Sequence, residues 1–135
     1  MTPLKWNRES VIGIGIFDQQ HREIVDEINE VQAAVEGGME QSVTGPLLTR
    51  LAGDTMDHFK AEEAMMAAAK YPGLMLHGMK HQRLLEQLKA FLGRYNRDGS
   101  MMDRHSLNFL RDWATTHIQS EDMNFGLWLN EHGKR

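Results

Sequence analysis

Apolar residues recur every three or four positions in four separate stretches of the chain, which is the spacing of one face of an α-helix. In the first stretch this apolar stripe contains Ile24, Ile28, Val31 and Val35. Nowhere does the sequence show the strict alternation of apolar and polar residues that is typical of a half-buried β-strand. The pattern therefore predicts an all-α fold, with helices over about residues 18–37, 46–70, 74–95 and 101–131.

Residues that favour helix ends stand between the four stretches. Asp18 is a candidate N-cap for the first helix, and Pro46 suits the first position of the second. Tyr71-Pro72-Gly73 should end the second helix, because proline cannot continue the hydrogen-bond ladder. Ser100 with Asp103 resembles a capping box at the start of the fourth.

Short connections place successive helices antiparallel, so the expected architecture is an up-down-up-down four-helix bundle about 30 Å long. Residues 1–17 include Pro3, Gly13 and Gly15 and should form an irregular N-terminal arm. A chain of 135 residues has the length of a single domain with one modest core. We therefore expect residues 1–135 to form one domain.

Composition narrows the function classes. The net charge of −4 argues against nucleic-acid binding, which calls for a basic surface. The apolar run at residues 11–17 is too short to span a membrane and lacks the basic flank of a signal peptide, so a soluble cytoplasmic protein is expected. The absence of cysteine excludes thiolate metal sites and iron–sulfur clusters, which leaves imidazole and carboxylate as metal ligands.

Histidines occupy core positions in every expected helix, where apolar side chains normally pack. They are His21, His58, His77, His81 and His117. One histidine on an apolar stripe is more often a hydrogen-bonded core residue than a metal ligand. Five in one core are different, because an unsatisfied buried polar group costs about 1–3 kcal/mol and a metal site satisfies several at once. The other two histidines, His105 and His132, fall off the stripes and should face solvent.

The spacing of these residues suits metal binding. Side chains at positions i and i+4 lie on the same face of a helix and can reach the same ion. His58 and Glu62 have this spacing, and so do His77 and His81. Each pair alone is a weak signal, because such spacings are common by chance. Their convergence with the other core histidines makes a metal site the favoured interpretation.

Two acidic residues compete for a role after the last core histidine. Glu121 lies at position i+4 from His117, on the same helical face. Asp122 lies at i+5, which an ideal α-helix rotates by about 140° from the histidine. Helical periodicity alone therefore favours Glu121 as the acidic partner of His117.

Four motifs carry most of these residues: FDQQH at 17–21, HFKAEE at 58–63, YPGLMLHGMKH at 71–81 and HIQSED at 117–122. Together they resemble the motifs of the hemerythrin family, and specifically those of the bacterial hemerythrins. The resemblance covers nearly the whole chain, including Trp6 and Gly13 in the arm. It implies a four-helix bundle around a non-haem di-iron centre that binds dioxygen.

The resemblance also implies a set of seven metal ligands: His21, His58, Glu62, His77, His81, His117 and Asp122. His77, His81 and His117 would hold one iron ion, and the other two histidines would hold the second. The two carboxylates would bridge the ions together with an oxo or hydroxo group. The family uses the aspartate five residues after its last histidine, so the resemblance favours Asp122 over Glu121. The ion with two imidazoles would keep an open position for dioxygen.

The implied ligand pocket is lined by Phe59, Trp113, Ala114, Ile118 and Phe125. Three positions depart from the family pattern. Ala114 stands where the family usually has leucine, which should widen the pocket and speed both ligand exchange and autoxidation. Phe125 replaces a frequent tyrosine, and Asp54, where an aromatic residue is common, should lie on a solvated helix face.

The favoured function is reversible dioxygen binding, as a carrier, a store or a delivery partner for an oxygen-consuming enzyme, without catalytic activity. The first alternative is an oxygen- or redox-sensing domain excised from a signalling protein with an output domain. The second alternative is a di-iron oxidase or peroxidase that uses a pocket widened at Ala114.

Overall fold

The computed structural model describes residues 3–5, 11–38, 41–98 and 104–132. The first three helices are α1 (Gly15–Glu36), α2 (Gln41–Ala69) and α3 (Leu74–Asp98). A fourth continuous rod has three parts: α4 (Arg104–Thr116), the π-helical segment η2 (His117–Asp122) and α5 (Met123–Glu131). The described residues contain no strand, which confirms the all-α prediction.

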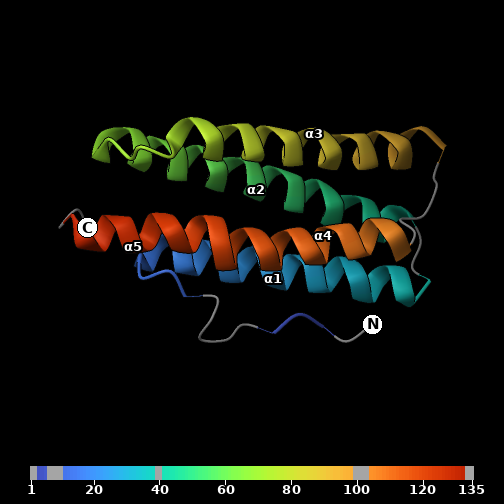
Figure 1. The fold of residues 1–135 in the computed structure, drawn as a ribbon. Coiled ribbons are helices and arrows are strands. Elements are labelled where there is room, and N and C mark those ends of the chain that lie inside the picture. The colour runs from blue at the N-terminus through green and yellow to red at the C-terminus, as the bar shows by residue number, and fades with distance from the viewer. Residues whose placement is uncertain (1–2, 6–10, 39–40, 99–103, 133–135) are drawn as a thin grey trace.

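The four rods lie side by side, and rods that follow one another in sequence run in opposite directions (Figure 1). α1 packs against α2 and α4, and α2 packs against α3. This arrangement is the predicted up-down-up-down bundle. None of the described helices is long and apolar enough to cross a membrane.

α1 begins at Gly15, earlier than expected, and the prediction that Asp18 is its N-cap is wrong. Ile14 occupies the N-cap position without a side-chain hydrogen bond. The Asp18 carboxylate instead accepts hydrogen bonds from the backbone N–H groups of Ile12, at 2.8 Å, and Gly13, at 3.2 Å. Its negative charge also favours the first turn of the helix, where the macrodipole is positive. Asp18 therefore ties the arm to α1.

α2 begins at Gln41, so the prediction that Pro46 takes the first helical position is wrong. Pro46 lies inside the helix, where its missing N–H removes one backbone hydrogen bond. The loss falls close to the N-terminus and leaves the long remainder of the ladder intact. The capping box predicted from Ser100 and Asp103 lies outside the described residues.

The turn between α2 and α3 lies where the sequence predicts it. α2 ends at Ala69, and Lys70 adopts a left-handed conformation with φ of 59°. The backbone N–H of Tyr71 then donates to the carbonyl of Met66 at 2.9 Å, which satisfies a carbonyl of the last helical turn. Pro72 follows, and α3 begins at Leu74.

Buried apolar side chains form two clusters, and we name them by their order along α2. The first cluster contains Ile24, Ile28, Val31, Leu48, Leu51, Leu88, Leu107, Leu110 and Ala114. The second cluster contains Ile12, Ile14, Phe17, Met66, Ile118, Phe125 and Leu129. Burying a large apolar side chain contributes roughly 1.5–3 kcal/mol, so both clusters stabilise the bundle. On α2 the two clusters are separated by the stretch that contains His58 and Glu62.

The N-terminal arm packs closely on two helices. The amide side chain of Asn29 makes two hydrogen bonds to the backbone of Leu4, at 2.8 and 2.9 Å. Farther along, a Cβ atom at Gly126 would stand only 2.1 Å from the carbonyl oxygen of Ile12. Glycine is therefore required at this position of α5, because any side chain would push the arm off the bundle.

Glu27 is a charged residue buried between α1 and α2, with a side chain only 6% exposed. Burial, together with a hydrogen bond to the nearby carboxyl of Asp54, raises the pKa of Glu27 to about 8. Arg50 lies 3.8 Å away and opposes this rise. Asp54 is exposed, as expected, although it also faces Glu27. Near neutral pH the carboxyl of Glu27 therefore retains its proton.

Replacing Glu27 by glutamine should change how stability depends on pH. The folded-state pKa of about 8 exceeds the ordinary value of 4.5, so the folded protein binds the proton more tightly and loses stability as pH rises through this range. Denaturant unfolding at pH 5 and pH 8 should show that E27Q avoids about 1–2 kcal/mol of this loss. E23Q, on the exposed face of the same helix, should behave like the unmodified protein. Parallel pH profiles for all three proteins would contradict the assignment.

Candidate metal centre

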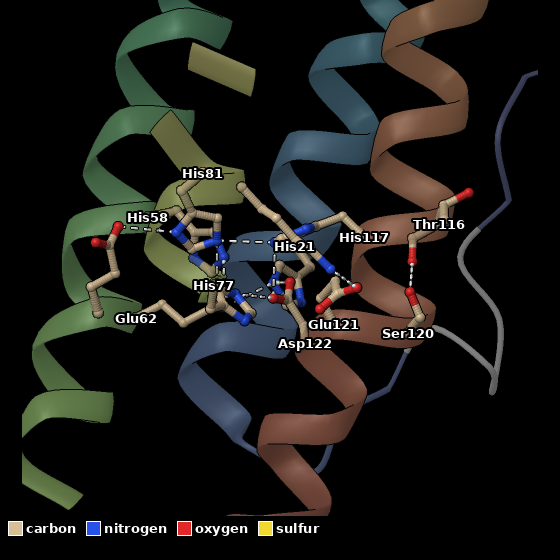
Figure 2. Close-up of polar contacts among 12 residues, drawn as sticks. His21, His58, Glu62, His77, His81, Thr116, His117, Ser120, Glu121 and Asp122 are labelled. Carbon is tan, nitrogen blue, oxygen red and sulfur yellow. Dashed lines mark hydrogen bonds and ion pairs between the residues drawn. The ribbon is translucent and has the colours of Figure 1, made fainter. Parts of the chain in front are cut away.

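Seven ionisable side chains from all four rods converge in one layer of the bundle (Figure 2). The residues are His21 from α1, His58 and Glu62 from α2, His77 and His81 from α3, and His117 and Asp122 from η2. None of them is more than 5% exposed. They are the same seven residues that the hemerythrin resemblance implies. The layer lies between the two apolar clusters, so water does not compensate its charges.

Regular α-helix explains the placement on α2 and α3. The Nε2 atom of His58 lies 3.2 Å from an oxygen of Glu62, one helical turn later. On α3 the rings of His77 and His81 meet edge to face, with centroids 4.4 Å apart. The i, i+4 spacing therefore presents both side chains of each pair to the same layer, as predicted.

The π-helical segment explains the position of Asp122. In a π-helix the backbone bonds join residues five apart, so residues i and i+5 come to the same side. Nε2 of His117 lies 3.1 Å from an oxygen of Asp122. Glu121 points away and forms an ion pair with Lys80 at the surface. The expectation from α-helical periodicity, which favoured Glu121, is wrong because the helix is not α at this point.

The ligand atoms fall into two groups that share both carboxylates. One group contains Glu62, His77, His81, His117 and Asp122, and the other contains His21, His58, Glu62 and Asp122. Within each group the nitrogen and oxygen atoms all lie within 4.8 Å of one another. Three imidazoles therefore surround one potential ion position, and two imidazoles surround the second.

Hydrogen bonding within the protein does not satisfy this layer. Several buried atoms lack a well-directed hydrogen bond although each has an ion-pair partner 2.9–3.2 Å away, including Nε2 of His21 and of His58, Oε2 of Glu62 and both carboxylate oxygens of Asp122. The Nε2 atoms of His81 and His117 lie 2.9 Å apart. Orphaned buried acceptors and facing imidazole nitrogens fit bound cations, and a ligand set of imidazole and carboxylate without thiolate suits iron.

The imidazoles and carboxylates of the layer also shift one another's pKa values. Burial lowers the pKa of His21 and of His77, but the carboxylates of Asp122 and Glu62, which accept hydrogen bonds from the imidazoles, outweigh it and raise each pKa to about 9. Burial raises the pKa of Glu62 and of Asp122, but bonds to the imidazoles outweigh it and hold both pKa values below their usual range. His58 behaves differently, because burial dominates and lowers its pKa. The carboxylates are thus ionised and ready to bind a cation.

Two further residues orient the imidazoles from outside. Nδ1 of His58 donates to the amide oxygen of Gln20 at 2.6 Å, and Nδ1 of His81 donates to the carboxylate of Glu63 at 3.0 Å. These bonds leave Nε2 of each ring free to face the centre. Sequence reasoning missed both residues. Each lies next to a core residue in a recognised motif, but its helical position is that of a solvent-facing side chain.

The predicted pocket residues occupy different places around the layer. Phe59 stacks on His81, with ring centroids 3.7 Å apart, and meets Trp113 edge to face at 5.8 Å. Ala114 belongs to the first apolar cluster, and Trp113 packs against it. Ile118 and Phe125 belong to the second apolar cluster. Of the two histidines assigned to solvent, His132 is exposed, and the side chain of His105 lies outside the described part.

Known proteins resemble this chain in sequence and in structure. Bacteriohemerythrin of Stenotrophomonas maltophilia (strain R551-3) is 27% identical over 132 residues, which cover 98% of this chain and 85% of that protein. Myohemerythrin-1 of Phascolopsis gouldii is 27% identical over 115 residues, which cover 82% of this chain and 90% of that protein. The crystal structure of a wild-type hemerythrin superposes with a TM-score of 0.87 at 25% identity, and the match covers 93% of this chain and 96% of that one.

The family model of the hemerythrin HHE cation binding domain matches residues 12–129. That span includes α1, α2, α3 and the π-helical segment, and with them every side chain of the buried layer. The resemblance found in the four sequence motifs is thereby confirmed. This chain belongs to the hemerythrin family.

Proposed function

We propose that the buried layer holds two iron ions and that the protein binds dioxygen reversibly, as a carrier, store or delivery protein and not as an enzyme. The observation that carries the proposal is the unequal division of imidazoles around two shared carboxylates. His77, His81 and His117 would hold one ion, and His21 with His58 the other. Glu62 and Asp122 would bridge the ions, together with a solvent-derived oxygen.

The ligand count supports a single binding position for a small molecule. Iron in such sites takes roughly six ligand atoms. Three imidazoles, two bridging carboxylates and a bridging solvent oxygen would supply that number at one ion. An ion held by His21 and His58 would have one protein ligand fewer and would keep a position open. When bound, the iron pair would supply the electrons for reversible attachment of dioxygen at that position.

The surrounding side chains support binding without turnover. The ring of Phe17 meets His58 edge to face at 5.6 Å, and the ring of Phe59 lies 6.0 Å from it. Both phenylalanines are buried. These apolar neighbours exclude water and offer no protons, and both properties disfavour proton-coupled turnover at the centre. Gln20 meanwhile fixes the ring of His58 in one orientation.

The absorption spectrum of the iron-loaded protein tests the proposed function directly. The reduced protein should gain a visible band on exposure to air and lose it on deoxygenation, over repeated cycles. The reversible band would follow from an open iron position inside an apolar layer. Immediate and permanent conversion to the ferric spectrum would contradict carriage and would favour the oxidase or sensing alternative.

A pair of neighbouring substitutions tests which acidic residue binds metal. D122N should lower iron affinity at least about 100-fold, since losing even an outer partner of a ligand costs about 10–100-fold. E121Q should keep its iron, because it removes only an ion pair with Lys80, and surface pairs are worth about 0–1 kcal/mol. Iron content after dialysis against a chelator measures both. Equal retention in the two variants would contradict the role of Asp122.

Restoring a leucine at the family position tests the pocket. Ala114 is only 1% exposed, and A114L should narrow the path to the iron, slowing autoxidation and ligand exchange several-fold. Decay of the oxygenated band in air measures the rate. A34L is the matched control, because Ala34 is also buried but lies about 20 Å along α1 from His21. An A114L rate equal to that of A34L would refute the effect.

A further inference from the structure

A surface groove of about 550 Å³ opens directly beside the buried layer. It runs between α3 and the fourth rod and is lined by Leu84, Phe109 and Trp113 on its apolar side. His117 also lines it, although that residue is almost fully buried. A groove of this size falls within the range of small-molecule sites, about 300–1,000 Å³.

The polar groups of the groove are balanced in charge. Lys80 and Glu121 pair with each other, and Arg83 and Asp112 add one charge of each sign. Asn108 adds an amide that both donates and accepts hydrogen bonds. An apolar aromatic floor with a neutral, mixed polar rim suits a flat conjugated ring that carries carbonyl and N–H groups at its edge.

Aromatic contacts connect the floor of this groove to the buried layer by two routes. The rings of Trp113 and His117 lie 6.4 Å apart and are tilted by only 30°. Trp113 also meets Phe59 at 5.8 Å, and Phe59 stacks on His81 with an interplanar angle of 1°. Both routes end on imidazoles of the three-histidine group. A ring bound on Trp113 would therefore lie close to that ion position.

The side of the layer that the groove reaches argues against a role in dioxygen entry. By the ligand count above, an ion held by His81 and His117 would have no open position. A groove on this side suits transfer of electrons to the centre through a metal-binding imidazole. A second groove, of about 190 Å³, reaches His58 in the two-histidine group, but it is smaller and its lining includes Glu23, Asp54 and Asp57.

We propose that the groove at His117 binds a planar two-electron donor of the flavin or quinone class and positions it to return the ferric centre to the ferrous state. This inference rests on the proposed function. The reduced donor would give up two electrons and two protons. When bound, the two ferric ions would accept one electron each, and the protons would pass to solvent at the open groove. Phe109 and Trp113 hold the ring, and Arg83 with Asn108 binds its edge.

Binding is tested first, on the iron-loaded ferric protein. Riboflavin, flavin mononucleotide and a water-soluble naphthoquinone are titrated in separate experiments, with flavin fluorescence or protein tryptophan fluorescence as the readout. Saturable binding of at least one compound is expected, and the compound that binds most tightly identifies the donor class. Absence of saturable binding of all three up to their solubility limits would overturn the proposal.

Matched tryptophan substitutions locate the binding. N108W fills the groove at His117 and should weaken binding at least about tenfold, whereas Q82W places the same bulk in a different groove on α3 and should not. Iron content and thermal unfolding establish that both variants are folded. Equal binding by N108W and Q82W would overturn the assignment of the groove.

Anaerobic stopped-flow reduction completes the test. The rate of iron reduction should saturate as the concentration of reduced donor rises. Dithionite, which is too small to need a groove, gives the reference rate for each protein. Relative to that reference, the rate with the donor should fall about tenfold in N108W but not in Q82W. A rate that rises linearly with donor in all three proteins would overturn the role in electron delivery. Donor binding does not depend on dioxygen, so a protein that binds the donor but forms no reversible oxygen band would contradict only the proposed function.

Discussion

The structure depends on the burial of seven ionisable side chains in one layer between two apolar clusters. A lone charge in such surroundings is unstable, and breaking a buried pair costs about 3–5 kcal/mol. The layer is tolerated because its members face one another: Nε2 of His77 lies 2.7 Å from Glu62 and 3.0 Å from Asp122. Protons on the imidazoles balance part of these charges, and bound cations would do so more completely. Stability and metal affinity are thus two results of the same arrangement.

The helices determine how this layer divides. α2 and α3 each contribute two side chains from one face, whereas α1 contributes only His21. The fourth rod adds His117 and Asp122 through a local change in helical winding. The result is three imidazoles around one position and two around the other, with shared carboxylates between them. The same inequality separates the two proposed tasks. Dioxygen would bind at the two-imidazole position, where a ligand is missing, and electrons would enter at the three-imidazole position, where the ligand set is complete.

Much of the fold followed from the sequence because helical periodicity and proline are local signals. The apolar stripes predicted the four rods, and Tyr71-Pro72-Gly73 predicted a turn that the structure contains. Helix starts were less predictable, because Asp18 accepts hydrogen bonds from backbone N–H groups of the preceding arm instead of capping α1. The π-helix was invisible to periodicity, which assumes one winding throughout. Gln20 and Glu63 were missed because only the packing of neighbouring helices brings them to the imidazoles.

The π-helical segment has a further consequence for how this chain tolerates change. A deletion of one residue between His117 and Asp122 would bring the aspartate to i+4, where ordinary α-helix presents it and every later residue to the same sides as before. Without such a deletion, ordinary α-helix through the present residues would turn Asp122 and every later residue by about 100° about the rod axis. Phe125 and Leu129 would then leave the second apolar cluster, and Gly126 would no longer meet the carbonyl of Ile12. The wider π-helical turn is therefore what allows one rod to serve the polar layer and the packing beyond it in a single register.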